Sequence, residues 1–199
     1  MSAHAMPELA LPMAEPRLVP DYQSMASIEP ARAKELMASV CAPVGIVTTT
    51  DSTGPHGATV SSFSALSADP FLITVAFERK SSFLQRVIDT KRFGVNLLGH
   101  GQEDLATLFA KRGVDRFADT AWHYDSGLPR IDGAAGWVGC ELANVVEAGD
   151  HLLLFGLVTS IGRAELSPLV YANRTFGTHS RFAERPRPTI VDSIAACSR

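Results

Sequence analysis

The chain has 199 residues, of which 46% are hydrophobic and 20% charged, and it carries a net charge of -3. This size and composition fit one globular domain with a full hydrophobic core. The slight acidic excess argues against a broad nucleic-acid surface, which is normally basic. The apolar runs are too short to span a membrane, and the N-terminus lacks the pattern of a signal peptide.

The first segment, residues 1–27, contains four prolines and no sustained hydrophobic period, so we expect a flexible N-terminal arm. A helix is predicted over residues 29–40, where Pro30 suits the first turn. Two more helices are predicted over 81–90 and 102–112, because their apolar residues recur with helical spacing.

Six segments rich in β-branched and apolar residues are predicted strands: 44–50, 57–63, 71–77, 92–98, 137–149 and 152–163. The last two are joined by Gly149-Asp150-His151, which predicts a tight hairpin turn. Consecutive strands with few helices favour a mainly β fold, an antiparallel barrel with flanking helices. We expect one domain over residues 28–180, followed by an irregular tail over 181–199.

Several familiar catalytic and metal-binding patterns are missing from the sequence. There is no G-x-G-x-x-G, no phosphate-binding G-x-x-x-x-G-K-[ST] and no G-x-S-x-G nucleophile elbow. The six histidines show no metal-ligand spacing, so no metal site is predicted. Cys41, Cys140 and Cys197 are far apart and odd in number, which favours reduced thiols in a cytoplasmic protein.

Two short polar segments are the candidate binding site. The stretch "GATVSSFSALSADP", residues 57–70, places several hydroxyls at a predicted strand end. The second segment, residues 79–82, adds Lys80 where a helix begins, and a helix N-terminus attracts phosphate. Together they could hold a phosphate and an attached polar chain. The alternatives are that Ser81 or Ser82 only caps the helix, and that the hydroxyls are ordinary strand and turn residues.

In chain order, the motifs resemble those of the flavin reductase-like family, the short-chain NAD(P)H:flavin oxidoreductases of two-component monooxygenases. The resemblance covers about residues 35–176 and runs through "PVGIVTTT", "GPHGATVSSFSALSADPFLITVAF", "KSSF", "RFGVNLL", "LFAKRGVDRF", "GLPRIDGAAGWVGCEL", "AGDHLLLFGLV" and "PLVY". One departure is Pro70-Phe71, where the family usually has two prolines.

The resemblance implies a split β-barrel (FMN-binding, Greek-key and antiparallel), usually a homodimer with FMN or FAD near the subunit interface. It implies flavin contacts at Thr59, Val60, Ser61, Ser62, Ser67, Asp69, Pro70, Lys80, Ser81, Ser82, Phe93, Gly94, Val95 and Asn96. His151 matches the histidine that the family associates with the nicotinamide nucleotide, NADH or NADPH. As a plain sequence feature, it is also a polar residue in a hairpin turn.

The implied function is hydride transfer from NADH or NADPH to FMN or FAD, with reduced flavin passing to a separate oxygenase. The alternatives are a flavin-binding sensor or carrier without reductase activity, and an oxidoreductase that retains FMN and acts on an organic substrate. Arg112, Arg116 and Arg174 either meet a cofactor phosphate or belong to solvated charge clusters. Four aromatic residues either wall a ring pocket or belong to the core: Trp122, Tyr124, Trp137 and Tyr171.

Overall fold

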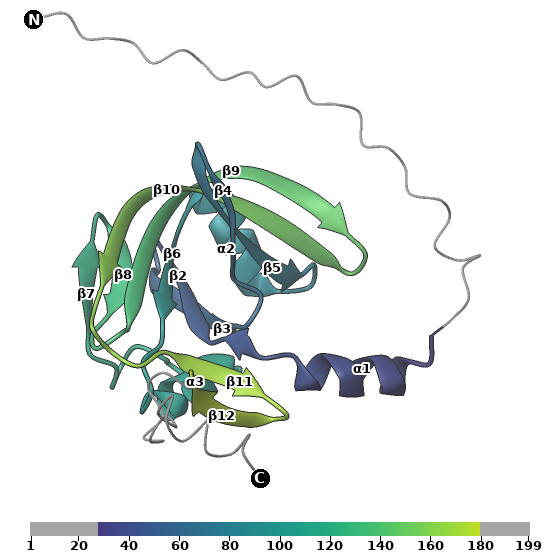
Figure 1. The fold of residues 1–199 in the computed structure, drawn as a ribbon. Coiled ribbons are helices and arrows are strands. Elements are labelled where there is room, and N and C mark those ends of the chain that lie inside the picture. The colour runs from purple at the N-terminus through teal and green to yellow at the C-terminus, as the bar shows by residue number, and fades with distance from the viewer. Residues whose placement is uncertain (1–27, 180–199) are drawn as a thin grey trace, which may run out of the picture.

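A computed structural model describes residues 28–179, and this part of the chain is mainly β-structure, as the sequence predicts (Figure 1). The predicted arm over residues 1–27 and tail over 181–199 lie outside the described residues. The strands form sheets of seven, three and two strands.

The helices of the described segment are α1 (Pro30–Ser39), α2 (Ser82–Thr90) and α3 (Glu103–Ala110). The strands are β1 (Ala42–Pro43), β2 (Gly45–Asp51), β3 (Gly54–Val60), β4 (Ser64–Ala68), β5 (Phe71–Glu78), β6 (Arg92–Leu97), β7 (Trp122–Asp125), β8 (Leu128–Ile131), β9 (Gly136–Ala148), β10 (His151–Arg163), β11 (Leu169–Ala172) and β12 (Thr175–Thr178).

The seven-stranded sheet has the order β3-β2-β6-β9-β10-β5-β4, and every neighbouring pair is antiparallel. It curves around α2, and the long β9–β10 hairpin arches over that helix (Figure 1). β3 and β4 are the two edge strands, so each leaves one row of backbone groups outside the ladder.

Two hydrophobic cores cover the opposite faces of β2. Val47 belongs to the first core, which includes Phe83, Leu84 and Val87 of α2. Ile46 belongs to the second, which lies under α3 and extends to β8 and β11. Successive side chains of a strand point to opposite faces, so a run such as Gly45-Ile46-Val47 is buried on both sides.

The predicted helices and the six long strands are confirmed, with ends shifted by a few residues. One boundary is wrong: residues 61–63 do not continue β3 and instead lead into β4. The short strands β1, β4, β7, β8, β11 and β12 were not predicted. β4 (Ser64–Ala68) has one large apolar residue, Leu66, among serines and alanines and is mostly exposed, so no hydrophobic alternation marks it.

Between residues 28 and 179, no helix is both long and apolar enough to cross a bilayer. Cys41 is an exposed free thiol, whereas Cys140 is a buried one. Burial raises the pKa of the Cys140 thiol to about 12. The predicted cytoplasmic location stays a prediction.

Candidate functional site

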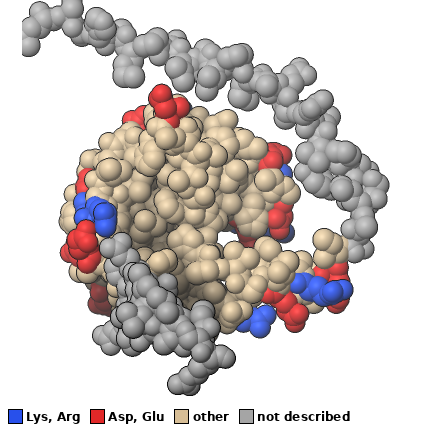
Figure 2. Space-filling view, in the orientation of Figure 1, with Lys and Arg blue, Asp and Glu red and all other residues tan. Residues whose placement is uncertain are grey.

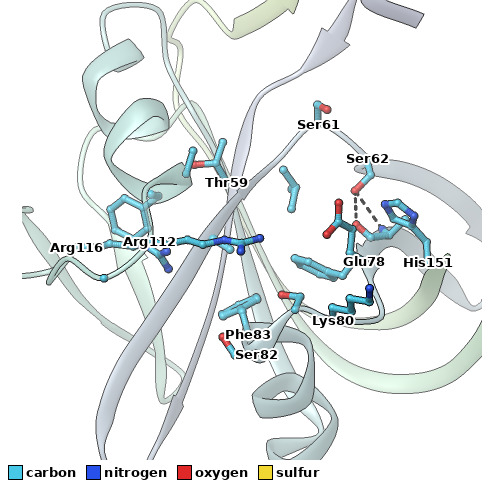
Figure 3. A pocket seen from close by; sticks show the side chains of 18 residues that line it. Thr59, Ser61, Ser62, Glu78, Lys80, Ser82, Phe83, Arg112, Arg116 and His151 are labelled. Carbon is cyan, nitrogen blue, oxygen red and sulfur yellow. Dashed lines mark hydrogen bonds between the residues drawn. The ribbon is translucent and has the colours of Figure 1, made fainter. Parts of the chain in front are cut away.

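A cavity of about 590 Å³ lies along β3, between the beginning of α2 and the end of α3 (Figure 3). Its volume is in the range of small-molecule and cofactor sites. It is lined by Ala58, Thr59, Val60, Ser61, Ser62, Ala76, Phe77, Glu78, Lys80, Ser81, Ser82, Phe83, Phe109, Ala110, Arg112, Gly113, Arg116 and His151. Phe83 belongs to the first core and Phe109 to the second, so the cavity opens where the two cores meet.

The exposed edge of β3 faces this cavity. The Nη1 atom of Arg116 donates a hydrogen bond of 2.6 Å to the backbone oxygen of Gly57, so that oxygen points away from β2. In an antiparallel pair, the backbone groups of alternate residues point to the same side. The N–H and C=O of Thr59 therefore also point off the edge, and they offer the cavity one donor and one acceptor.

Two of the hydroxyls in the 57–70 stretch hold the walls of the cavity together. Thr59 Oγ1 donates to the Ala106 backbone oxygen at 2.7 Å, which ties β3 to α3. Ser62 Oγ donates to the Ala76 oxygen at 2.9 Å and accepts from the Ala76 nitrogen at 3.1 Å. Ser61 is exposed and makes no side-chain hydrogen bond to any described residue (Figure 3). Its hydroxyl is thus available to a ligand.

The opposite wall is the beginning of α2. Ser81 is its N-cap, and its side chain accepts from the Leu84 nitrogen at 3.4 Å, so the capping alternative holds for Ser81. Ser82 is the first residue of the helix and is exposed. The backbone N–H groups of the first helical turn have no partner inside the helix and attract anions.

Two cations reach the cavity from opposite sides. Figure 3 shows Arg112 extending from the segment after α3 toward the middle of the cavity, with Lys80 on the far side. Neither side chain forms a salt bridge or hydrogen bond with another residue of the described chain. One carboxylate, that of Glu78, also lines the cavity. The cationic groups and the helix N-terminus favour a phosphate at this wall.

His151 lies at the end of the cavity beyond Glu78, its cross-strand partner on β5 (Figure 3). Its Nδ1 atom is 2.7 Å from Oδ1 of Asp150, which fixes the orientation of the ring. This hydrogen bond, with the charge of the imidazole when protonated, lowers the pKa of the Asp150 carboxyl below its usual value. The other ring nitrogen, Nε2, has no partner within residues 28–179 and can serve a ligand.

Seven of the residues implicated by the family resemblance lie outside this cavity. Ser67, Asp69 and Pro70 are at the far end of β4 and in its turn to β5. The other four form the middle of β6 and are buried: Phe93, Gly94, Val95 and Asn96.

The buried residues of β6 have structural partners in their own chain. Phe93 and Val95 belong to the first core. The Asn96 amide donates to the Ile46 oxygen at 3.2 Å and accepts from the Ile131 nitrogen at 2.7 Å, which joins β6 to β2 and β8. The predicted flavin contact of these residues therefore receives no support from the cavity.

The cavity also includes residues for which the sequence left two interpretations open. Arg112 lines the cavity, and so does Arg116, which donates to the oxygens of Gly57 and Lys111. Burial lowers the pKa of the Arg116 guanidinium from its usual value. Glu78 and Phe109 were not predicted to lie here, because no local pattern distinguishes them from an exposed strand end and a core residue.

The aromatic candidates and Arg174 lie elsewhere. Trp137 is 1% exposed and is part of the interior. Tyr171 packs against Phe176, with ring centroids 5.0 Å apart. Trp122 and Tyr124 are in β7, away from this cavity. Arg174 is in the turn between β11 and β12.

The chain is similar to several known proteins and to one family profile. The profile of the flavin reductase like domain matches residues 37–180. The reductase component of the flavin-dependent trigonelline monooxygenase of Acinetobacter baylyi is 34% identical over 152 residues, which are 74% of this chain and 48% of that protein. An NADH:FMN oxidoreductase of Rhodococcus qingshengii is 32% identical over 176 residues, 79% of this chain and 92% of that protein.

A solved structure supports the same fold. The NADH:FAD oxidoreductase SgcE6 of Streptomyces globisporus C-1027, in complex with NAD and FAD fragments, superimposes with a TM-score of 0.74 at 26% identity. The match covers 80% of this chain and 100% of that chain. The chain spans about half the length of the A. baylyi protein, 48%.

Proposed function

The chain belongs to the flavin reductase-like domain family, and on this premise we propose that it transfers hydride from NADH or NADPH to FMN or FAD. Reduced flavin would then pass to a separate oxygenase. One observation carries the proposal: an unpaired strand edge, a helix N-terminus and two cations without ionic partners among the described residues line a single cavity. The strand edge suits the edge of a polar ring, and the helix N-terminus and the two cations suit a phosphate.

The residues of the cavity fit a flavin nucleotide in both size and chemistry. The Thr59 backbone groups and the Ser61 hydroxyl would hold the ring edge, with Val60 beneath it. Lys80, Ser82 and the first N–H groups of α2 would hold the phosphate of the ribityl chain. Thr59 and Ser62 would act through their hydrogen bonds, which keep the two walls in place.

The proposed reaction makes modest demands on the protein. A bound flavin supplies the electrophilic ring that accepts a hydride from the nicotinamide, so no protein nucleophile is needed. The chain must bind both nucleotides, keep their rings in contact and exclude water. Donors directed at the ring edge would stabilise the negative charge that develops there on reduction. His151, oriented by Asp150, is placed to support the nicotinamide nucleotide and is not required as a general acid.

The direct test is an activity matrix of NADH and NADPH against FMN, FAD and riboflavin. We expect oxidation of at least one nicotinamide nucleotide together with bleaching of the flavin absorbance band. Bound flavin is measured before and after the reaction, which separates a diffusing flavin substrate from a retained one. Absence of turnover with every pairing would reject the reductase proposal.

A variant tests the phosphate wall. Lys80→Ala removes a cation near the beginning of α2, so it should raise the Kd for FMN by about tenfold, the loss of one charge-assisted hydrogen bond. Its effect on riboflavin, which has no phosphate, should be small. Lys34→Ala on the exposed helix α1 is the matched control. Equal weakening of FMN and riboflavin would contradict the assignment of Lys80 to the phosphate.

We also propose that the protein is a homodimer. Figure 2 shows a face whose charged side chains lie mostly at its margin, leaving a broad uncharged centre. Separately, the seven-stranded sheet carries exposed apolar side chains, which include Leu66, Phe71, Val146 and Ile161. Charge depletion and exposed apolar groups are typical of interfaces between subunits. Sedimentation analysis should give twice the mass of the monomer, and the Phe71→Asp variant should give a mass closer to that of the monomer.

Two other functions remain testable with the same cavity. A sensor or carrier would bind flavin with the same residues but would not oxidise NADH or NADPH. An oxidoreductase that retains FMN would keep flavin bound through turnover and would show ping-pong kinetics with an organic substrate. The proposed transfer to an oxygenase predicts instead that reduced flavin leaves the protein, which a flavin-trapping assay would detect.

A further inference from the structure

A second cavity, of about 490 Å³, lies next to the first and is not used by the reaction described above. Its floor is the first part of β3, including Pro55, His56 and Gly57, whereas the floor of the first cavity begins at Ala58. Residues of a strand are spaced by roughly 3.3 Å, so the two floors are contiguous.

Arg116 is the one residue that lines both cavities. Its guanidinium spans from the Gly57 oxygen, at 2.6 Å from Nη1, to the Lys111 oxygen, at 3.0 Å from Nε. It therefore forms the partition between the two spaces. Nη2 also donates to the Lys111 oxygen, so all three nitrogens bond to the backbone, and one N–H on each of Nη1 and Nη2 is left for phosphate oxygens. The partition is thus the point at which a chain of phosphates could pass from one cavity to the other.

One wall of the second cavity is aromatic. Phe117 and Trp122 both line it, and their ring centroids are 5.4 Å apart in an edge-on arrangement. Phe117 is buried, whereas Trp122 is half-buried, so part of the indole faces the open space. Such a surface suits a flat heteroaromatic ring, because stacking on an aromatic side chain is favourable for every nucleobase.

Two polar side chains of the lining, Asp115 and His56, are held in place by hydrogen bonds. Asp115 Oδ1 accepts from the Phe117 and Ala118 nitrogens at 3.0 and 3.2 Å. Its second oxygen, Oδ2, has no hydrogen-bond partner in the described part of the chain. A fixed carboxylate oxygen beside an aromatic wall is suited to accept from an exocyclic amino group.

His56 is fixed as firmly by the turn between β2 and β3. Its Nε2 atom is 3.0 Å from both Asp51 Oδ1 and Thr53 Oγ1, and Arg86 of α2 contacts the same carboxylate. These hydrogen bonds, first those from Thr53, lower the pKa of the Asp51 carboxyl well below its usual range. Nδ1 of His56 has no partner within residues 28–179, and it can bond to a ribose hydroxyl.

We propose that the second cavity holds the adenosine half of a dinucleotide whose reactive half occupies the first. Adenine would lie against Trp122, its amino group near Asp115 and its ribose near His56, while Arg116 would bind the connecting phosphates. This inference rests on the proposed function, and it predicts that the protein distinguishes FAD from FMN, or NADH from nicotinamide mononucleotide, through this cavity. The shared ligand is adenosine phosphate, and the source is resolved by experiment.

Val114→Trp tests the proposal, because Val114 lines the cavity, is 45% exposed and belongs to neither core. The larger side chain should occupy the cavity without removing a core contact, and Val114→Ala is its matched control. If the adenosine comes from FAD, the Kd for FAD should rise by about tenfold, because the stacking of one base is lost. The Kd for FMN, which has no adenine, should rise by less than about twofold. If it comes from NADH, the Kd values of both flavins stay constant and the KM for NADH rises with FMN as acceptor.

A second variant and a direct probe complete the test. Trp122→Leu should give the same selective loss, whereas His123→Leu, on the same strand but exposed and outside the cavity, should not. AMP should bind the wild-type protein in calorimetry and bind Val114→Trp more weakly. Unchanged FAD, NADH and AMP binding in both variants would overturn the proposal. If Val114→Trp weakens AMP binding, the adenosine site is supported even if the protein transfers no hydride. If the protein turns over but neither variant changes adenosine binding, only the reductase proposal is supported.

Discussion

β3 and β6 both carry residues that the family motifs associate with flavin, but their places in the fold differ. β3 is an edge strand, and its outer row of backbone groups faces the main cavity. β6 lies between β2 and β9, so both of its backbone rows are paired. Its side chains are also buried on both faces, from Phe93 to Asn96. In the described part of the chain, the outer edge of β3 is therefore open to a ligand, whereas residues 93–96 of β6 are buried.

The difference explains how one family pattern can combine two physical requirements. Ser61, just after the end of β3, stays exposed because β3 is an edge strand of the sheet. Residues of β6 are constrained by packing: the glycine at 94 leaves room for Trp137, and the amide at 96 joins three strands. Substitutions in β6 should therefore change stability, whereas those around β3 should change ligand affinity.

Gly94→Ala should cause the largest effect. A Cβ at Gly94 would lie 2.1 Å from Cη2 of Trp137, whose side chain is 1% exposed and has no room to move. We expect the free energy of unfolding to fall by about 3 kcal/mol, the upper range for overpacking, measured by urea denaturation. Gly177→Ala is the control, because nothing lies within 4 Å of its added Cβ. Equal stability of the two variants would remove the packing explanation.

Asn96→Ala is expected to have the next largest effect. It would leave the buried Ile131 N–H without its acceptor at 2.7 Å and would remove the donor to Ile46. The cost of such a buried unpaired group is about 2 kcal/mol of unfolding free energy. Flavin affinity of the folded protein should not change. A large loss of flavin affinity at constant stability would break the comparison and restore Asn96 as a flavin contact.

Much of the fold could be predicted from local chemistry. The run Phe71–Glu78 is apolar enough to indicate a buried strand, and Ser81 before Phe83 and Leu84 predicts the start of a helix. β7 and β8 escaped prediction because each has four residues, too few for a period to emerge. Their turn depends on Ser126 and Gly127, which both have positive φ.

The site was predictable only in part, because sequence shows which groups are present but not which are already bonded. Residues 59–62 and 80–82 do converge on one cavity. The hydroxyls of Thr59 and Ser62, however, bond to backbone atoms of α3 and β5, which are distant in sequence. The direction of the Arg112 side chain, just after α3, depends on how α3 packs on β3. No local sequence pattern reports that packing.

Arg112→Ala tests the β3 side of the comparison. Arg112 is exposed and has no ionic partner in residues 28–179, so its removal should leave the unfolding free energy nearly constant. The Kd for FMN or FAD should rise by about tenfold, because a cation that meets a phosphate is lost. Fluorescence titration at low and high salt measures this, and the difference should shrink at high salt. Arg163→Ala is the matched control, because within residues 28–179 Arg163 pairs only with the exposed Glu165. A change in stability without a change in affinity would assign Arg112 to the fold.

His151→Ala should have the smallest effect and should act on the other substrate. The side chain lies at the far end of the cavity and is held by Asp150 at 2.7 Å. Its loss should raise the KM for NADH or NADPH by about threefold, which corresponds to the loss of one weak hydrogen bond. The Kd for flavin should not change. Asp150→Asn should reproduce part of this increase, because it weakens the group that orients the ring. Because the pKa of the Asp150 carboxyl is lowered, this group stays ionised to a lower pH than an ordinary carboxyl, and its contact with His151 weakens only as the pH falls through that lowered pKa. Loss of the Asp150 charge should therefore add no pH dependence to KM between about pH 6 and 8. If His151→Ala instead raised flavin Kd and left KM constant, the histidine would belong with the β3 residues that hold flavin, and the division of the cavity between two nucleotides would have to be redrawn.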